Sequence, residues 1–307
     1  MTDLEIVFAG SPAAAVPSLQ ALTASRHDIL AVLTRQDSPQ GRTRALTPTA
    51  VGATSHALAL PTIKANRLAG EATDQIRALQ PDLGVIVAYG GLVREPLLSA
   101  PRFGWINLHF SLLPRWRGAA PVQRAIMAGD DLTGASVFQL VAELDAGDLF
   151  GQLTQPIGSH ETAGQLLDSL SFSGAELLVR VVDAIADGTA RPVAQHGDVT
   201  LAPKLGVEDG HIDWTQHATT VADLIRGVTP EPGAFTIIDG QRLKVLDSVI
   251  ARDTASLAPG AVGGSGRVLV GTATEPIELL QVQPAGKRAM AAADWWRGRP
   301  AATLVAE

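Results

Sequence analysis

The sequence predicts an α/β fold: a doubly wound, mostly parallel sheet in the N-terminal part, followed by a small β-barrel. In the first part, short apolar runs alternate with stretches of helical period, as in βα units around a parallel sheet. In the last part, several short strands are separated by Gly-rich turns, which is typical of a small barrel. A length of 307 residues corresponds to about two domains at roughly 150 residues each.

The first half begins with an apolar run at residues 4–8, which predicts a buried strand. A helix is expected from residue 10 to about residue 25, and a second strand at residues 29–33. Further helices are expected at about 48–60, 70–79, 120–128 and 162–186, and further strands at 61–64, 83–88, 105–110, 136–141 and 149–156, the last as an antiparallel or edge strand.

Residues 35–47 interrupt this alternation. They have no hydrophobic period, contain Pro39 and Gly41, and exceed the usual βα connection of about 2 to 6 residues. Loops of that length usually carry function. We therefore expect a functional loop here.

The composition changes after Gly188, where a polar stretch with two prolines predicts a linker. We expect a catalytic domain at 1–188, the linker at 189–206 and a second domain at 207–307. In the second domain we expect a five-stranded barrel, with a helix at 219–226 and strands at 234–238, 242–249, 266–271 and 278–283.

Composition excludes several classes of protein. The chain has no cysteine, so it has neither disulfides nor thiolate metal sites. Its formal net charge of −7 argues against non-specific coating of nucleic acid. Positive charge is nevertheless concentrated in residues 29–70 and 96–129. Charge alone does not separate a binding surface from solvated loops.

Familiar motifs are also missing. The turn after the first strand offers one glycine, Gly10, where a dinucleotide-binding motif has three, so a nicotinamide dehydrogenase is disfavoured. There is no Walker A motif and no nucleophile elbow. The seven histidines form no H-x-H or H-x-x-x-H pair, so we expect no metal.

Three polar residues predict a reactive site. Asn107 and His109 are two apart on an apolar strand and therefore share a face, at the carboxyl end where ligands bind in open α/β sheets. Asp145 follows the next strand, which we expect to end at the same edge. An amide, an imidazole and a carboxylate together can support acyl transfer. The alternative is that Asn107 and His109 only satisfy each other and nearby backbone.

The sequence around this site resembles a known family. Residues 107–121, Asn-Leu-His-Phe-Ser-Leu-Leu-Pro-Arg-Trp-Arg-Gly-Ala-Ala-Pro, and 144–148, Leu-Asp-Ala-Gly-Asp, are similar to the signature of the folate-dependent formyltransferases. These enzymes move a formyl group from 10-formyltetrahydrofolate to an amine. Segments similar to the branch of the family that acts on methionyl-tRNA lie at 41–48, 201–205, 212–214, 232–235 and 280–290. The resemblance covers essentially the whole chain in order.

The resemblance implies a role for each site residue. Asn107 would stabilise the oxyanion, His109 would act as acid–base and electrostatic partner, and Asp145 would orient His109 and help to take the proton. The folate co-substrate, 10-formyltetrahydrofolate, would be bound without a metal by Ser111, Leu112, Leu113, Pro114, Val87, Ala88, Tyr89 and Gly90. The first domain would be Rossmann-like and the second OB-like. Phe110 departs from the small residue or proline of many members.

The resemblance also implies initiator methionyl-tRNA as the second substrate. It would be held by Arg42, Arg44, Lys204, Lys287 and Arg288, with Arg42 entering the acceptor stem. A solvated surface charge stays open as the alternative for each of these cations. We further expect a cytoplasmic protein with no membrane association, because the N-terminus lacks a basic export signal and no run of about 18 apolar residues occurs. The resemblance, together with the lack of an obvious apolar interface stripe, implies a monomer.

Two other functions remain open. One is a formyltransferase for a sugar-nucleotide or another small amine, which the basic loop and the second domain disfavour. The other is a non-catalytic RNA-binding protein, which the joint presence of Asn107 and His109 disfavours.

Overall fold

The computed structural model describes residues 3–40, 44–264, 266–297 and 304–307. The chain divides into two compact units: Met1–Pro121, Leu132–Pro156 and Leu167–Ala202 form the first, and Val122–Asp131, Ile157–Leu166 and Pro203–Glu307 form the second. The second unit thus takes in two short segments from within the expected domain 1–188, which composition does not distinguish from their neighbours.

A seven-stranded sheet forms the centre of the first unit, in the order β10-β9-β7-β6-β1-β2-β5. Its parallel strands are β1 (Glu5–Gly10), β2 (Asp28–Thr34), β5 (Thr62–Lys64), β6 (Leu83–Val87) and β7 (Trp105–His109). β9 (Leu132–Gln139) runs antiparallel to β7, and β10 (Leu149–Pro156) antiparallel to β9. The mostly parallel sheet and the antiparallel edge strand are confirmed.

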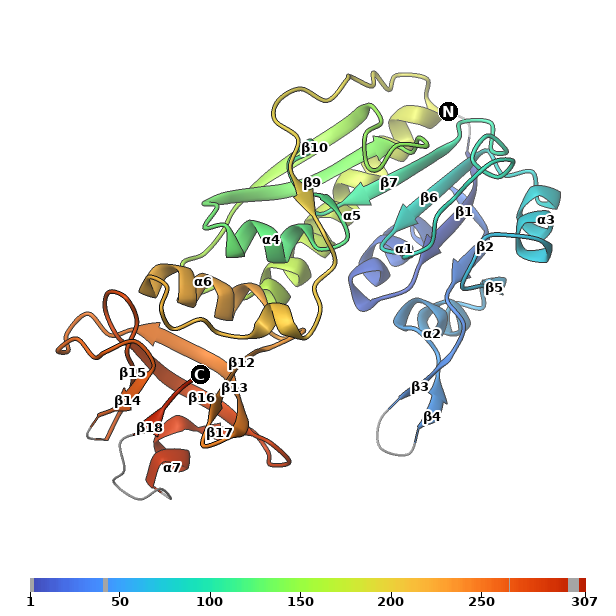
Figure 1. Ribbon diagram of the computed structural model, residues 1–307. Helices are drawn as coiled ribbons and strands as arrows, with labels where there is room; N and C mark the ends of the chain where they lie inside the picture. Colours follow the sequence, from blue (N-terminus) through green and yellow to red (C-terminus); the bar gives the residue numbers. More distant parts are fainter. Residues whose placement is uncertain (1–2, 41–43, 265, 298–303) are drawn as a thin grey trace. The chain divides into compact units, whose positions relative to one another are not determined.

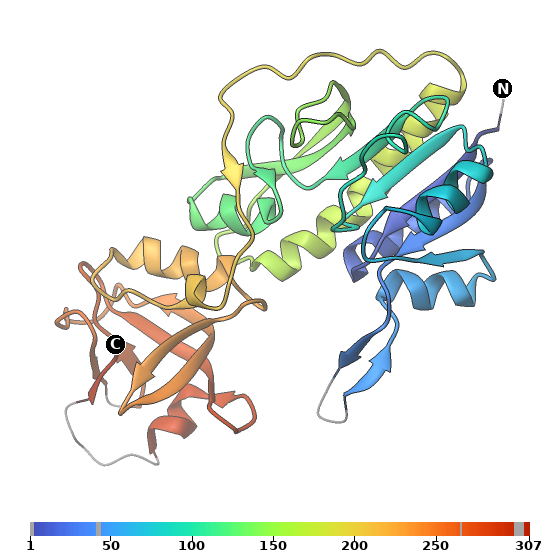
Figure 2. The same cartoon turned by 45° about the vertical axis from the view of Figure 1, so that its right-hand side comes forward.

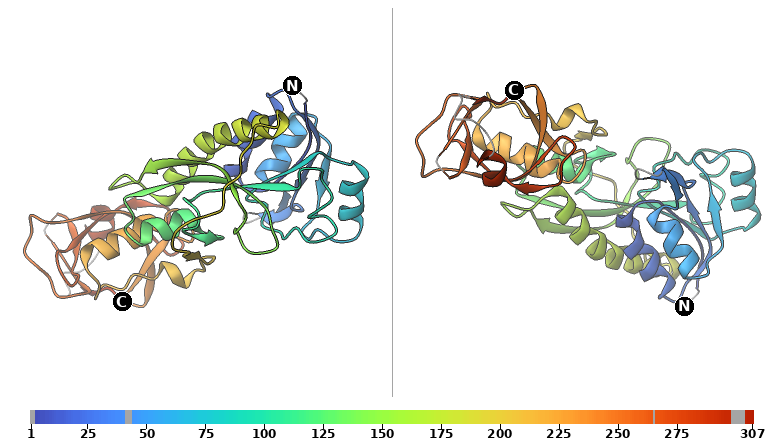
Figure 3. Two further views of the ribbon diagram at one scale, coloured as in Figure 1. Left: turned by 90° about the horizontal axis from the view of Figure 1, so that it is seen from above. Right: turned by 90° about the horizontal axis from the view of Figure 1, so that it is seen from below.

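Helices accompany this sheet. They are α1 (Val16–Thr23), preceded by a 3-10 turn at Ala13–Ala15, then α2 (Ala50–Ala57), α3 (Glu71–Ala78) and α5 (Ala163–Ala186). All but the first residue of α4 (Pro121–Met127) belongs to the second unit. α5 lies along one face of the sheet (Figure 3), and a Cβ on its Gly174 would be 3.2 Å from Leu108 of β7. Because successive strand residues point to opposite faces, Asn107 and His109 point away from α5.

The described residues of the insertion at 35–47 include the two strands of a β-hairpin. β3 (Ser38–Gln40) and β4 (Ala45–Thr47) pair antiparallel, and they project beyond α2 in Figures 1 and 2. The expectation of a stretch without regular structure was wrong here, because three-residue strands are too short to show an alternating pattern.

The predicted linker also contains regular structure. β11 (Leu201–Ala202) pairs in parallel with β8 (Arg117–Gly118), within the segment that sequence patterns predict as a loop after β7. Two-residue strands carry no sequence periodicity. This pair attaches residues 117–118 to the linker.

The second unit contains a barrel with α6 (Ala218–Gly227), α7 (Ala292–Arg297) and a 3-10 turn at Glu208–Gly210. Its strands are β12 (Ala234–Ile238), β13 (Gln241–Ile250), β16 (Ile277–Pro284), β15 (Val268–Val270), β14 (Ala261–Gly263) and β18 (Leu304–Val305) in sheet order, with β17 (Met290–Ala291) on β16. A bridge between Ile238 and Ala306 joins the two ends of this path. The described residues of the second unit thus form a sheet of seven strands and not the expected five, because β14, β17 and β18 span only two or three residues each and were not predicted.

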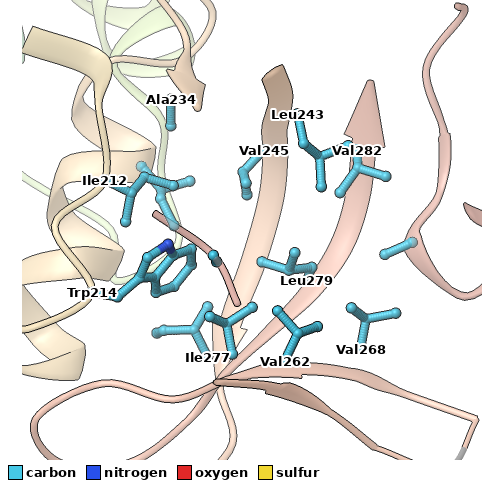
Figure 4. Packing of buried hydrophobic residues seen from close by; sticks show 14 of the residues in the cluster. Ile212, Trp214, Ala234, Leu243, Val245, Val262, Val268, Ile277, Leu279 and Val282 are labelled. Atoms are coloured by element: carbon cyan, nitrogen blue, oxygen red, sulfur yellow. The ribbon is translucent and has the colours of Figure 1, made fainter. Parts of the chain in front are cut away.

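The barrel encloses its own apolar core. Trp214, Leu243 and Ile277 are at most 3% exposed and point inward together (Figure 4). The Trp214 indole N–H donates to Thr236 Oγ1 at 2.9 Å, which satisfies its one polar group. Over the described ranges, no helix is long and apolar enough to cross a bilayer.

Candidate active site

His109 lies at the carboxyl end of β7 with 6% of its surface exposed. Its Nε2 is 2.8 Å from the carbonyl oxygen of Trp116. Because a carbonyl only accepts, this hydrogen bond requires the hydrogen on Nε2 and leaves Nδ1 as the basic nitrogen. Nδ1 faces Asp145 Oδ2 at 3.8 Å.

The surroundings of His109 set its charge. Burial lowers the pKa of His109 below its ordinary value, and the Asp145 carboxylate and the bond to Trp116 offset part of that effect. The imidazole is therefore neutral at physiological pH. A neutral imidazole with a free basic nitrogen beside a carboxylate can accept a proton during a reaction.

Asp145 reaches this position by a route that sequence patterns do not predict. β9 pairs antiparallel with β7, so its last residue, Gln139, lies opposite Ile106, near the start of β7. The expectation that β9 ends at the same edge as β7 was therefore wrong. The loop 140–148 brings Asp145 to His109, and Asp145 Oδ2 accepts from the Gly118 N–H at 2.8 Å.

Asn107 is half-buried on the same face of β7 as His109. Its Oδ1 is buried and has no hydrogen-bond partner in the described part of the chain. Asn107 Oδ1 therefore does not form the hydrogen bond with His109 that the alternative interpretation would require. A side chain with unused hydrogen-bonding capacity beside a neutral imidazole is suited to bind a polar reacting group.

The described residues contain no group of three or more metal-ligating side chains. Asn107, His109 and Asp145 are an amide donor, a base and a carboxylate, which is a set of groups able to stabilise and deprotonate a tetrahedral intermediate of acyl transfer.

Comparison with known proteins identifies the family. Residues 4–182 match the formyl transferase family and residues 204–300 match the formyl transferase C-terminal domain. A methionyl-tRNA formyltransferase from Clavibacter sepedonicus is 57% identical over 304 residues, covering 99% of this chain and 100% of that protein. The chain belongs to the methionyl-tRNA formyltransferase family. A second such enzyme, from Leifsonia xyli subsp. xyli, is 59% identical over 298 residues, covering 96% of this chain and 97% of the other.

The fold is also that of solved formyltransferases. The N-formyltransferase from Helicobacter canadensis, in complex with folinic acid and dTDP-3-aminofucose, superimposes with a TM-score of 0.70 at 16% identity. The match covers 91% of this chain and 98% of that one. At this level of identity the likeness concerns the fold alone.

Two short segments carry the folate-binding residues expected for a methionyl-tRNA formyltransferase. In the first, Ser111 Oγ donates to the Arg115 carbonyl at 2.6 Å, and the Leu113 N–H donates to Ser136 Oγ at 3.2 Å. Ser111, Leu113 and Pro114 are buried, whereas Leu112 is half-buried. These contacts join the segment 111–114, which begins two residues after His109, to Arg115 and to Ser136 of β9.

The second segment, Val87–Gly90, follows β6. Val87 and Tyr89 are buried, and Ala88 and Gly90 are exposed. The Tyr89 hydroxyl donates to the Ala65 carbonyl at 2.5 Å, and Arg35 Nη2 donates to the Gly90 carbonyl at 2.5 Å. The solvent-facing surface of this segment is therefore contributed by Ala88 and Gly90.

The residues expected to bind tRNA are in different parts of the chain. Arg44 is exposed in the hairpin, Lys204 is exposed after β11, and Lys287 and Arg288 are exposed between β16 and β17. Arg42 lies outside the described residues. Four other cations of the two basic stretches have hydrogen-bond or ion-pair partners in the protein: Arg35 with Gly90, Lys64 with Asp37, Arg117 with Gln195 and Arg124 with Asp209.

Sequence reasoning missed the residues that hold the site together. The Trp116 carbonyl fixes the proton on His109 Nε2, and the Gly118 N–H binds Asp145. Both act through the backbone, so their side-chain types give no signal. Phe110, which departs from the family pattern, is 6% exposed and packs in the interior.

Proposed function

We propose that this chain transfers the formyl group of 10-formyltetrahydrofolate to the α-amino group of methionine on initiator methionyl-tRNA. The observation that carries the proposal is the buried His109, held neutral with Nδ1 facing Asp145 and with Asn107 on the same face of β7. Membership in the methionyl-tRNA formyltransferase family supports this donor and this acceptor.

The proposed reaction is an acyl transfer. The methionine nitrogen attacks the formyl carbon, and Asn107 Nδ2 donates to the oxygen that becomes negatively charged. The amine gives up a proton toward the His109 and Asp145 pair as its bond to carbon forms. The bond from carbon to N10 of the folate then breaks, and N10 takes up a proton. The products are formylmethionyl-tRNA and tetrahydrofolate.

We further propose that each substrate contacts the segments expected from the sequence. The segments 87–90 and 111–114 line the folate pocket, and Arg42, Arg44, Lys204, Lys287 and Arg288 contact the tRNA. The domains are 1–188 and 207–307, joined by the linker 189–206. The enzyme works as a monomer in the cytoplasm, where initiator tRNA is charged and used.

The test is a transfer assay with a radiolabelled formyl donor. Methionyl initiator tRNA is offered beside free methionine and a sugar-nucleotide amine. Label on the charged tRNA alone is the expected result. Label on a small amine alone would support formyl transfer but show that methionyl-tRNA is not the acceptor. No transfer to any amine would favour a non-catalytic RNA-binding protein.

A further inference from the structure

The segment that leaves α5 pairs through its backbone with Leu149 at Val193, and two of its side chains are partly buried against the rest of the first unit. Between residues 191 and 201, Gln195 and Thr200 are half-buried and the other residues are exposed. The segment runs as an extended yellow chain in Figures 1 and 2. Buried polar side chains are normally hydrogen-bonded, so these two residues are expected to make specific contacts.

The Gln195 amide uses its full hydrogen-bonding capacity. Its Oε1 accepts from Arg117 Nη2 at 2.7 Å and from Arg117 Nε at 3.2 Å. Its Nε2 donates to the carbonyls of Asp145 at 2.8 Å and Gly147 at 2.9 Å. Two donors and two lone pairs are the complete set for a carboxamide. One side chain therefore connects the loop of Asp145 to strand β8.

The two elements that Gln195 connects are the ones that surround His109. Asp145 has φ of +46°, in the left-handed region where a residue with a Cβ is held only by its surroundings. Its carboxylate accepts from Gly118, the residue after Arg117. The neighbouring Thr200 Oγ1 accepts from the N–H of Trp116, whose carbonyl binds His109. Residues 195 and 200 thus support both contacts of the imidazole.

We infer that Gln195 is a positioning residue that holds the Asp145 carboxylate against His109. The inference rests on the proposed function for its kinetic readout. Without the two bonds from Nε2, the carbonyls of Asp145 and Gly147 lose this donor, and the loop 140–148 holds the carboxylate less firmly, through the Gly118 N–H and the Arg117–Glu143 pair. A displacement of about 1 Å at a reacting group is able to lower the rate by roughly 100-fold.

The electrostatic surroundings of His109 give a second readout. The residues of the two neighbouring strands at this point are uncharged: on β6, Val87 pairs with Leu108, and on β9, Ser136 pairs with His109. The Phe138 ring lies edge-on to the imidazole, with the ring centroids 6.4 Å apart. The Asp145 carboxylate, 3.8 Å from Nδ1, raises the pKa of His109. The nearby Arg117 faces Glu143 at 3.6 Å as well as Gln195. Displacing Asp145 must therefore lower the pKa of His109 further.

The experiment compares Gln195→Glu and Gln195→Ala with Gln75→Ala in the full-length protein. Gln195→Glu keeps an acceptor for Arg117 and replaces the donor with a carboxylate that repels the two carbonyls. Gln75 is an exposed residue of α3 whose amide binds Glu71, and it serves as the matched control. The measurements are kcat and KM for both substrates, the pH profile of kcat/KM, and the pKa of His109 from NMR of the imidazole.

We expect both Gln195 variants to lower kcat by about 10- to 100-fold with KM changed by less than about threefold. In Gln195→Ala, which adds no charge, we also expect the acid limb of the profile and the NMR pKa of His109 to move to lower pH. A kcat within about twofold of wild type in both variants, or a lower kcat in Gln195→Ala with the pKa of His109 unchanged, overturns the inference. If the wild-type chain fails to formylate methionyl-tRNA, the proposed function is wrong, and the NMR comparison alone then decides the role of Gln195.

Discussion

Nδ1 of His109 lies 3.8 Å from Oδ2 of Asp145, although the strands that precede these residues, β7 and β9, run in opposite directions. The loop after β9 therefore has to return along the sheet, and its conformation is held by bonds from outside the loop. Gly118 binds the Asp145 carboxylate and Gln195 binds its carbonyl. The site thus depends on segments that are far apart in sequence and that contribute no reactive group.

Removing either member of this pair should abolish most of the activity. We expect His109→Ala and Asp145→Ala each to lower kcat by about 100- to 10,000-fold, the usual contribution of a general acid–base group. The measurement is formyl transfer to methionyl initiator tRNA, with circular dichroism and tRNA affinity as controls for folding. Substantial turnover by a folded variant would remove that residue from the mechanism.

Asn107 should affect the chemical step more than substrate binding. If its amide donates to the developing oxyanion, Asn107→Ala should lower kcat by about 100- to 1,000-fold with little change in KM. Asn66→Ala is the matched control, because Asn66 is hydrogen-bonded to Gln36 on the surface. A rise in KM with kcat unchanged would instead assign Asn107 to ground-state binding.

The pH dependence should follow the lowered pKa of His109. Burial favours the neutral imidazole, so the active form persists below the ordinary pKa and is lost only as the pH falls through the lowered value. The acid limb of kcat/KM should therefore lie below about pH 6.5. In Asp145→Asn this limb should move to still lower pH, because the carboxylate raises the pKa of His109. A shift of the limb to higher pH would contradict this assignment.

Arg42, in the basic insertion at 35–47, should matter for tRNA and not for folate. We expect Arg42→Ala to raise KM for methionyl-tRNA by about tenfold, the effect of roughly 1.4 kcal/mol of lost binding energy. The change should shrink at high salt, because phosphate contacts are screened. Arg67→Ala is the control, since Arg67 is an exposed cation outside the insertion. Equal changes in KM for both substrates would mean that the insertion shapes the enzyme and does not bind tRNA.

Gly118 should be intolerant of a side chain. Its φ is +126°, and a Cβ would lie 2.7 Å from the carbonyl oxygen of Ala202. Gly188 also has a positive φ but open space around it, so Gly188→Ala should cost about 1–2 kcal/mol. Gly118→Ala should lower the free energy of unfolding by more than that, and should also lower kcat because Gly118 binds Asp145. Urea unfolding and transfer assays measure both. Equal losses of stability in the two variants would show that the clash with Ala202 relaxes without cost.

Most of the fold was predictable because its long elements carry strong periodic patterns. The parallel strands, the antiparallel edge strand β10 and the long helix α5 were all expected within a few residues. The hairpin strands β3 and β4 and the short strands β14, β17 and β18 were not, since two or three residues show no period. Their pairing is set by neighbouring strands and by turns.

The sequence by itself determined the chemistry that is possible here: Asn107 and His109 share one strand face because of the two-residue repeat, and the polar groups suited to acyl transfer are recognisable by type. The tertiary structure decided how those groups are arranged. The direction of β9, the return of the loop to His109, and the bonds from Trp116, Gly118 and Gln195 all depend on contacts between distant segments. Backbone hydrogen bonds and a lone amide leave no periodic pattern, so they become visible only when the chain has folded.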